Sequence, residues 1–190
     1  MAPRFGASDL GHIIVLIRSA KETLDRTMTT KQRTHEGGCT CGHVRYKMAS
    51  DPLIVHCCHC RWCQRQTGAS FALNALIETT RVEVLSGEPE AIKVESPGGD
   101  GQIIVRCPNC RVAVWSNYLI AGEHIRFIRV GSLDNPDLLP PDVHIFTSTK
   151  QPWVVIPKGH AAFTGSYETN RVWSEDSLKR RDIYLAALEG

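Results

Sequence analysis

Eight cysteines in three groups constrain this chain of 190 residues more than any other feature. The central group places four cysteines within seven residues: Cys57, Cys58, Cys60 and Cys63. One pair precedes this group and one follows it: Cys39 with Cys41, and Cys107 with Cys110. The sulfurs around a tetrahedral zinc lie about 3.8 Å apart, and a C-x-C pair on one face of a strand or a C-x-x-C turn can provide that separation. The spacing predicts metal sites, and the number of cysteines predicts two of them.

Metal binding explains these cysteines better than disulfide bonds do. Eight cysteines among 190 residues are far fewer than in a small disulfide scaffold. The early apolar run at residues 13–17 is too short to cross a bilayer, and no small-residue cleavage site of a secretory signal follows it. We therefore expect a cytoplasmic protein without a membrane partner, in a compartment where clustered cysteines bind metal. An iron–sulfur or redox role is the remaining alternative to zinc.

Composition and charge are those of an ordinary globular domain. Hydrophobic residues make up 42% of the chain and charged residues 22%, and 190 residues suffice for a sizeable core. The formal net charge of +2 gives no electrostatic reason to expect nucleic acid as a partner. The longest basic run, at residues 179–181, covers only three residues, so we interpret it as a solvated helix face.

The chain divides into three parts. Residues 1–34 are interpreted as an N-terminal extension. It either contains a peripheral helix at residues 19–27, capped by Ser19, or precedes a natural start at Met28. Residues 35–165 are expected to form the zinc domain. Residues 166–190 form a C-terminal tail, in which the leucine spacing predicts a helix at residues 174–188.

Short apolar segments separated by turn residues predict an all-β domain with short strands, pinned by zinc. Gly42, directly after Cys41, suits the left-handed backbone that metal-binding turns often need. The expected strands cover residues 44–48, 52–55, 70–77, 81–85, 91–95, 103–106, 112–118, 125–130, 144–148 and 153–156.

The two outer cysteine pairs favour a structural zinc. They supply four thiolates from distant parts of the chain, which makes a closed coordination shell and ties two halves of the domain together. The members of this predicted site are Cys39, Cys41, Cys107 and Cys110.

The central cysteines favour a zinc with an open position. The spacing allows three sulfurs to bind one ion, those of Cys58, Cys60 and Cys63. Three protein ligands with a free fourth position are typical of a catalytic zinc. Cys57 points the other way if the chain is extended, because neighbouring side chains in a strand face opposite sides. The alternative is a second closed structural zinc, completed by Cys57, His56 or His59.

Four motifs give the chain a resemblance to a known family. They are GGCTCGHVRY at residues 37–46, CHCRWCQRQTGASF at residues 58–71, RCPNC at residues 106–110, and VGSLDNPD with PDVHIFTSTKQPWVVI between residues 130 and 156. Together they resemble the glutathione-dependent formaldehyde-activating enzymes, a family that also includes proteins similar to centromere protein V. The resemblance implies a tent-like, all-β fold with two zinc ions per chain, one structural and one catalytic, on the same residues that the spacing groups.

One residue departs from the family pattern. In the family, the C-x-x-C pair is usually followed by glycine. In this chain, Arg111 follows Cys110 instead. A non-glycine residue in the left-handed region costs about 1 kcal/mol, which a zinc site can absorb.

The resemblance implies a carbon–sulfur lyase similar to S-(hydroxymethyl)glutathione synthase, with a small-molecule thiol and an aldehyde as substrates. Three thiolates leave such a zinc site negatively charged, which favours activation of the incoming thiol over polarisation of the aldehyde. Gln64, Arg65 and Thr67 are candidates for orienting a substrate carboxylate or a ligand, with a role as solvated turn residues as the alternative. Trp153 is expected in the core. The alternative function is a non-enzymatic, zinc-stabilised binding module similar to centromere protein V.

Overall fold

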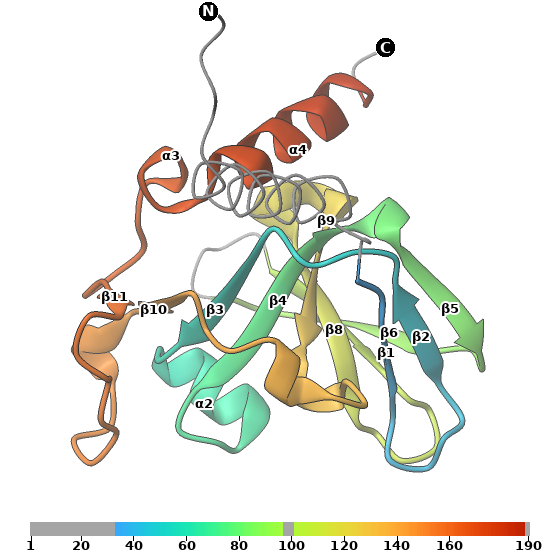
Figure 1. Ribbon diagram of the computed structural model, residues 1–190. Helices are drawn as coiled ribbons and strands as arrows, with labels where there is room; N and C mark the ends of the chain where they lie inside the picture. The colour runs from blue at the N-terminus through green and yellow to red at the C-terminus, as the bar shows by residue number, and fades with distance from the viewer. Residues whose placement is uncertain (1–32, 97–100, 189–190) are drawn as a thin grey trace, which may run out of the picture. The chain divides into compact units, whose positions relative to one another are not determined.

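The structure is a computed structural model that describes residues 33–96 and 101–188. All eight cysteines lie in one compact unit, Thr34–Gly190. Strands dominate the described part of this unit, in a small sheet with the order β1-β2-β5 and a larger one with the order β11-β10-β3-β4-β9-β8-β7-β6 (Figure 1). The strands are β1 (His35–Gly38), β2 (Arg45–Met48), β3 (Ile54–Cys58), β4 (Ala72–Glu78), β5 (Val82–Ser86), β6 (Glu90–Val94), β7 (Gln102–Arg106), β8 (Ala113–Tyr118), β9 (Ile125–Arg129), β10 (Val143–Ile145) and β11 (Ala161–Ala162).

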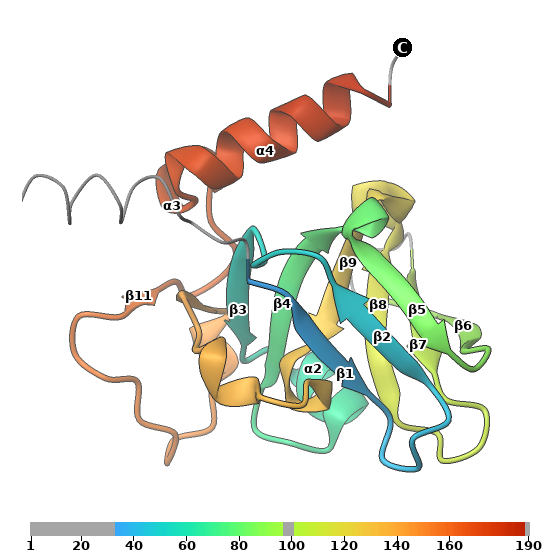
Figure 2. The same cartoon turned by 45° about the vertical axis from the view of Figure 1, so that its right-hand side comes forward.

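The main core lies where the small sheet packs against one face of the larger sheet (Figure 2). Tyr46 and Met48 are two residues apart on β2 and both are fully buried, as expected for side chains on the same face of a strand. Tyr46 packs edge-on against Trp115 with a ring separation of 5.6 Å. Its hydroxyl forms a 2.7 Å hydrogen bond with the hydroxyl of Ser132. Burial of each such side chain stabilises the fold by about 1.5–3 kcal/mol.

In the described part of the chain, the helices are short except for α4. The α-helices there are α2 (Arg61–Thr67), α3 (Thr169–Val172) and α4 (Glu175–Ala186). The 3₁₀ turns are η1 (Thr79–Arg81), η2 (Leu119–His124), η3 (Val130–Ser132), η4 (Pro136–Leu138) and η5 (Thr147–Thr149).

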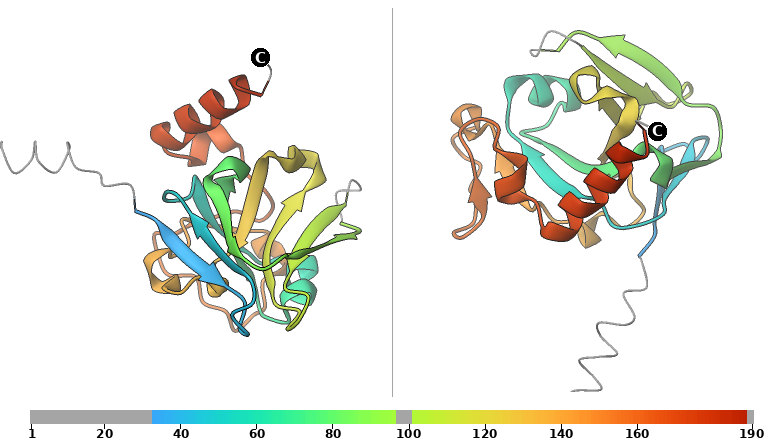
Figure 3. Two further views of the ribbon diagram at one scale, coloured as in Figure 1. Left: turned by 90° about the vertical axis from the view of Figure 1, so that its right-hand side faces the viewer. Right: turned by 90° about the horizontal axis from the view of Figure 1, so that it is seen from above.

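The C-terminal helix α4 begins at a capping residue and is fastened to the sheets. The side chain of Ser174 accepts a hydrogen bond from the backbone N–H of Ser177, which satisfies one free amide of the first turn. Arg180 donates two hydrogen bonds to the buried carboxylate of Glu78, at 2.6 and 2.7 Å. The Ser177 hydroxyl donates to the backbone oxygen of Leu53. These contacts place α4 at the opposite end of the sheets from α2 (Figures 1 and 3).

The mostly-β fold and the C-terminal helix predicted from the sequence are confirmed. The strands expected at residues 44–48, 81–85 and 103–106 match β2, β5 and β7 to within one residue at each end. Gly42 and Arg111 both have the expected left-handed backbone, with φ of 75° and 62°. The helix expected at residues 19–27 and the question of the start at Met28 lie outside the described residues.

The structure differs most clearly from the predictions in two segments. The predicted strand at residues 153–156 is wrong, because this segment has no strand neighbour and lies between Pro152 and Pro157, which cannot donate to a ladder. The core position predicted for Trp153 is wrong for the same reason, since its side chain is 70% exposed. Beyond β10, residues 147–149 form the turn η5 rather than a continued strand. Among the described residues, no helix combines the length and hydropathy that crossing a bilayer requires.

Candidate metal centres and the pocket beside them

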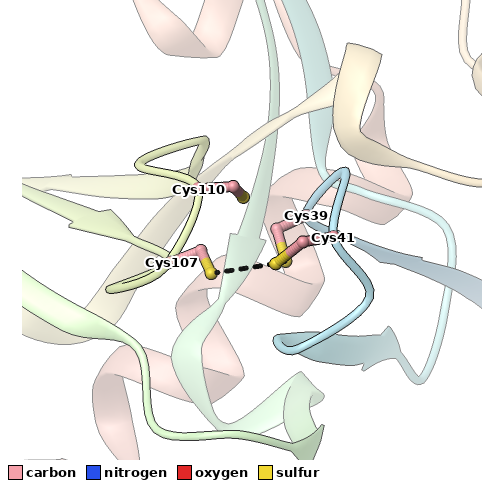
Figure 4. A group of neighbouring side chains, drawn as sticks. All are labelled: Cys39, Cys41, Cys107 and Cys110. Carbon is pink, nitrogen blue, oxygen red and sulfur yellow. Dashed lines mark hydrogen bonds between the residues drawn. The ribbon is translucent and has the colours of Figure 1, made fainter.

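Two similar turns bring the outer cysteine pairs together (Figure 4). In the first turn, Cys39 donates its N–H to Val44 and accepts at its carbonyl from Gly42. In the second turn, Cys107 donates to Val112 and accepts from Arg111 in the same way. Gly42 and Arg111, one residue after the last cysteine of each pair, take the left-handed conformation that closes the turn. The first turn connects β1 to β2, and the second connects β7 to β8.

The sulfur separations in this group match a four-thiolate zinc shell. The Cys41 Sγ lies 3.5 Å from the Cys39 Sγ and 3.7 Å from the Cys107 Sγ. All four sulfurs, including that of Cys110, lie within 4.8 Å of one another, against about 3.8 Å around a tetrahedral zinc. The donor set therefore fits a zinc ion without rearrangement.

The close spacing of these thiols makes it difficult for all four to ionise at once. The Val112 backbone N–H holds the pKa of the Cys110 thiol down at about 6. The hydrogen bond from the His43 backbone lowers the pKa of Cys41, but the neighbouring thiols outweigh it and raise that pKa to about 12. A divalent cation between the four sulfurs removes this conflict, because it stabilises all of them as thiolates.

The central cysteines form a second group at the junction of β3 and α2. Cys58 is the last residue of β3, and Cys60 is the N-cap of α2, where its sulfur accepts a 3.3 Å hydrogen bond from the Cys63 N–H. The three sulfurs of Cys58, Cys60 and Cys63 lie within 4.8 Å of one another. The pKa of Cys60 is lowered, first by hydrogen bonds of the Cys58 and Cys63 thiols and then by backbone N–H groups. Three sulfurs without a fourth protein ligand within this distance, among the described residues, leave one side of the group open.

That open side faces a pocket of about 620 Å³, within the range of small-molecule sites. All three cysteines of the central group line it. Its remaining wall is largely apolar and aromatic, from Trp62, Tyr118, Phe127, Ile145 and Phe146. Among the described side chains around the pocket, Arg61 is the one that carries a fixed positive charge.

Tyr118 is a pocket residue that the sequence reasoning missed. Its hydroxyl oxygen lies 3.9 Å from the Cys63 sulfur. Burial raises the pKa of Tyr118, and the Cys63 thiol raises it further, so the hydroxyl stays protonated and can donate a hydrogen bond. In the sequence, Tyr118 is simply the last residue of an apolar strand, and no local signal marks it.

The family model described as glutathione-dependent formaldehyde-activating enzyme matches residues 34–149, which include all eight cysteines. The chain belongs to this family. Membership supports a glutathione-related, formaldehyde-activating function at the level of the family. A crystal structure of a Rhodobacter sphaeroides protein is similar over 56% of this chain and 96% of its own chain, with 16% identical residues and a TM-score of 0.41. No protein of curated function matches the chain.

The family motif CHCRWCQRQTGASF also carries residues that lie outside the three-cysteine group. Within the described residues, His59 is grouped with Cys57 and His144 rather than with Cys58. His56, just before the motif, faces the pocket and pairs with the hydroxyl of Tyr167 at 2.5 Å. Burial lowers the pKa of His56 to about 4, so its ring is neutral at neutral pH.

The three polar candidates after the last central cysteine, Gln64, Arg65 and Thr67, have different surroundings. The Gln64 amide donates to the backbone oxygens of His59 and Thr149, at 2.7 and 3.1 Å, so its donors are committed to the protein. The Thr67 hydroxyl donates to the Cys63 backbone oxygen at 2.8 Å. Arg65 is exposed and lines a polar hollow of about 530 Å³ together with Arg61. Of the three, Arg65 is the side chain left free to meet a substrate carboxylate.

Proposed function

We propose that this member of the family is a zinc-dependent enzyme of the carbon–sulfur lyase type, which adds a glutathione-like thiol to a small aldehyde. The observation that carries the proposal is the open three-cysteine group of Cys58, Cys60 and Cys63 in the wall of a mostly apolar pocket. The two zinc sites and the cytoplasmic location remain predictions from the sequence.

The donor chemistry of the three-cysteine group fits zinc, and its separations have the same upper limit as those of the four-cysteine group. A zinc ion at Cys58, Cys60 and Cys63 would lower the pKa of an incoming thiol and so provide a thiolate nucleophile at neutral pH. The four-cysteine group of Cys39, Cys41, Cys107 and Cys110 has a closed set of donors, so we assign it a structural role.

The pocket residues would assist the addition in two ways. In the reaction, a thiolate sulfur bonds to the carbonyl carbon, and the carbonyl π electrons move to the oxygen, which then takes a proton. Tyr118, with a protonated hydroxyl close to Cys63, is placed to donate a hydrogen bond to that oxygen. The apolar side chains of Trp62 and Phe127 lower the polarity of the pocket wall, which strengthens such a hydrogen bond.

A thiol that carries carboxylates, as glutathione does, finds cations beside the pocket. Arg61 lines both the apolar pocket and the polar hollow, and Arg65 lines the hollow. The Arg61 guanidinium donates to the Gln64 side chain at 2.7 Å, which fixes it at the boundary between the two. We infer that the thiol enters the apolar pocket while its carboxylate meets Arg61 and Arg65.

The alternative function is a binding module similar to centromere protein V. The arrangement of the charged residues gives this alternative less support. The basic run at residues 179–181 gives no free cationic face, because each member has an acidic partner. The pairs are Lys179 with Glu175, Arg180 with Glu78, and Arg181 with Asp182. We therefore expect small molecules rather than nucleic acid as partners.

The test compares zinc content and catalysis in wild type, Cys60→Ser and His43→Gln, the last being an exposed control. Rates of adduct formation from glutathione and formaldehyde, above the uncatalysed rate, are measured beside zinc per folded chain. Cys60→Ser should lose one zinc equivalent and the catalysed rate while staying folded, and His43→Gln should keep both. A folded Cys60→Ser protein that catalyses the reaction at the wild-type rate contradicts the proposal. Unfolding as severe as that of Cys107→Ser would make the central group a structural clamp instead.

A further inference from the structure

A third group of donor side chains lies on the face of β3 opposite the pocket. Strands β3 and β10 pair in parallel, and this pairing sets His144 beside Cys57 and Ile145 beside Cys58. Side chains directly paired across two strands point to the same face. Cys57 and His144 therefore share one face, while Cys58 and Ile145 share the other, which lines the pocket. His59 follows two residues after Cys57 and joins it.

The three donor atoms of this group converge at short range. The Cys57 sulfur lies 3.5 Å from the His59 Nε2, which in turn lies 3.0 Å from the His144 Nδ1. All three atoms lie within 4.8 Å of one another. Around a tetrahedral zinc, a sulfur and a nitrogen lie about 3.5 Å apart and two nitrogens about 3.3 Å apart. The group thus already has nearly the separations of a Cys-His-His metal shell.

The backbone holds His59 in place for this role. Its N–H donates to the Ile145 oxygen at 2.9 Å. Its carbonyl accepts from the Gln64 amide and from the Thr149 hydroxyl, at 2.7 and 3.1 Å. On the side-chain face, the ring of Phe71 packs edge-on against the His59 imidazole. A ligand fixed in this way loses little entropy when it binds an ion.

Hydrogen bonding alone does not satisfy these side chains. Cys57, His59 and His144 are 2%, 0% and 6% exposed. A single proton can be shared between the two facing imidazole nitrogens, and the Cys57 thiol then competes for the same His59 Nε2 at 3.5 Å. The His59 Nδ1 and the His144 Nε2 are buried without a partner among the described residues. These are the ring nitrogens opposite the two that converge on Cys57, so the case for an ion rests on the burial and the convergence of the three facing atoms.

We propose that Cys57, His59 and His144 form a third metal site, for a divalent ion of the zinc class. An imidazole pair with one thiolate is a donor set that zinc accepts, and one ion between the three atoms uses all of their facing lone pairs. The site joins β3 to β10 across 85 residues of sequence. It is separate from the proposed catalytic group, because its side chains point to the other face of β3.

The experiment counts zinc on the intact chain by native mass spectrometry, after reconstitution with Zn²⁺ and removal of the excess. Wild type and the exposed-histidine control His43→Gln should each carry three zinc ions. Cys57→Ser and His144→Gln should each carry two, and the double variant should also carry two, because both substitutions remove the same ion. Two ions on wild type, or three on both single variants, overturns the proposal.

A second measurement needs no variant and so does not depend on their folding. Crystals of the wild-type protein are grown with Zn²⁺, and anomalous diffraction is recorded on both sides of the zinc edge. The proposal requires an anomalous peak between the Cys57 sulfur and the rings of His59 and His144. Peaks at the two all-cysteine groups with none at this position refute the third site, while the proposed function stays intact.

Discussion

Replacing Cys107 by serine should remove the zinc of the four-cysteine group and so destabilise the domain. The size of the effect depends on the length of the loop that this zinc cross-links. Cys41 and Cys107 are 66 positions apart. A cross-link over such a loop restricts the unfolded chain by about 4 kcal/mol at 25 °C. For a domain of this length each kcal/mol corresponds to about 2–4 °C in Tm, so loss of the zinc clamp should lower Tm by about 8–16 °C.

The central group provides a control of the same chemistry and a different loop length. Cys58 and Cys63 are only five positions apart, for which the same relation gives about 2 kcal/mol. Cys60→Ser should therefore lower Tm by about half as much as Cys107→Ser, although each variant loses one thiolate. The difference isolates loop closure from the chemistry of a cysteine-to-serine change.

The assay is a thermal melt followed by circular dichroism, with and without a strong chelator. Chelation also removes the zinc of the central group, so it should bring wild type and Cys107→Ser to a common Tm, with the larger drop in wild type. A Cys107→Ser protein that melts with wild type in the absence of chelator refutes the assignment of a structural zinc. Equal losses for Cys60→Ser and Cys107→Ser refute the loop-length argument.

Two further predictions concern tyrosines, the half-buried Tyr118 and the fully buried Tyr46. Tyr118→Phe removes the hydroxyl beside Cys63, so the catalysed rate should fall about 100-fold with zinc content unchanged, while Tyr184→Phe in α4 should leave the rate alone. Burial raises the pKa of Tyr46 to about 12 in the folded state, against about 10 unfolded. The stability from its neutral hydroxyl is therefore complete below pH 10 and is lost as pH rises towards 12. Denaturant titrations of Tyr46→Phe should show a flatter decline across that interval; an unchanged slope contradicts this reasoning.

The sequence predicted those parts of the molecule that depend on local geometry. In a C-x-C pair and in a C-x-x-C turn, a few backbone angles fix the positions of both sulfurs. The outer cysteines could therefore be recognised as metal-binding pairs from the sequence alone. The same holds for the positive φ of Gly42 and Arg111, because the backbone needs this conformation to close the turn after each cysteine pair. The C-terminal helix was predicted from its leucine spacing, and the structure adds the side-chain cap of Ser174 at its start.

Features that depend on long-range pairing could not be predicted in this way. Tyr118 reaches Cys63 only because β8 and β9 follow β4 in the larger sheet. Helix α2 is seven residues long and has no apolar repeat to announce it. Residues 153–156 are a continuous apolar run rich in β-branched residues, as in a buried strand, but they lie between two prolines and find no strand partner, so Trp153 and Val155 are left exposed.

The end of β3 shows how one short segment can supply two donor groups without conflict. Alternation along the strand sends Cys57 to one face and Cys58 to the other, and the N-cap of α2 then turns Cys60 back towards Cys58. Because His59 lies between them, its backbone is held by Gln64 and Thr149 while its ring joins Cys57. A substitution that shifts this backbone must therefore disturb both groups at once, whereas a side-chain substitution on one face should affect one group alone. Zinc is counted on Cys57→Ser, Cys58→Ser and Gln64→Ala. Each cysteine variant should lose one zinc ion, whereas Gln64→Ala, which frees the His59 backbone, should lower the zinc occupancy of both groups. A Gln64→Ala protein with full occupancy of both groups would show that the hydrogen bond from Gln64 to the His59 backbone is dispensable.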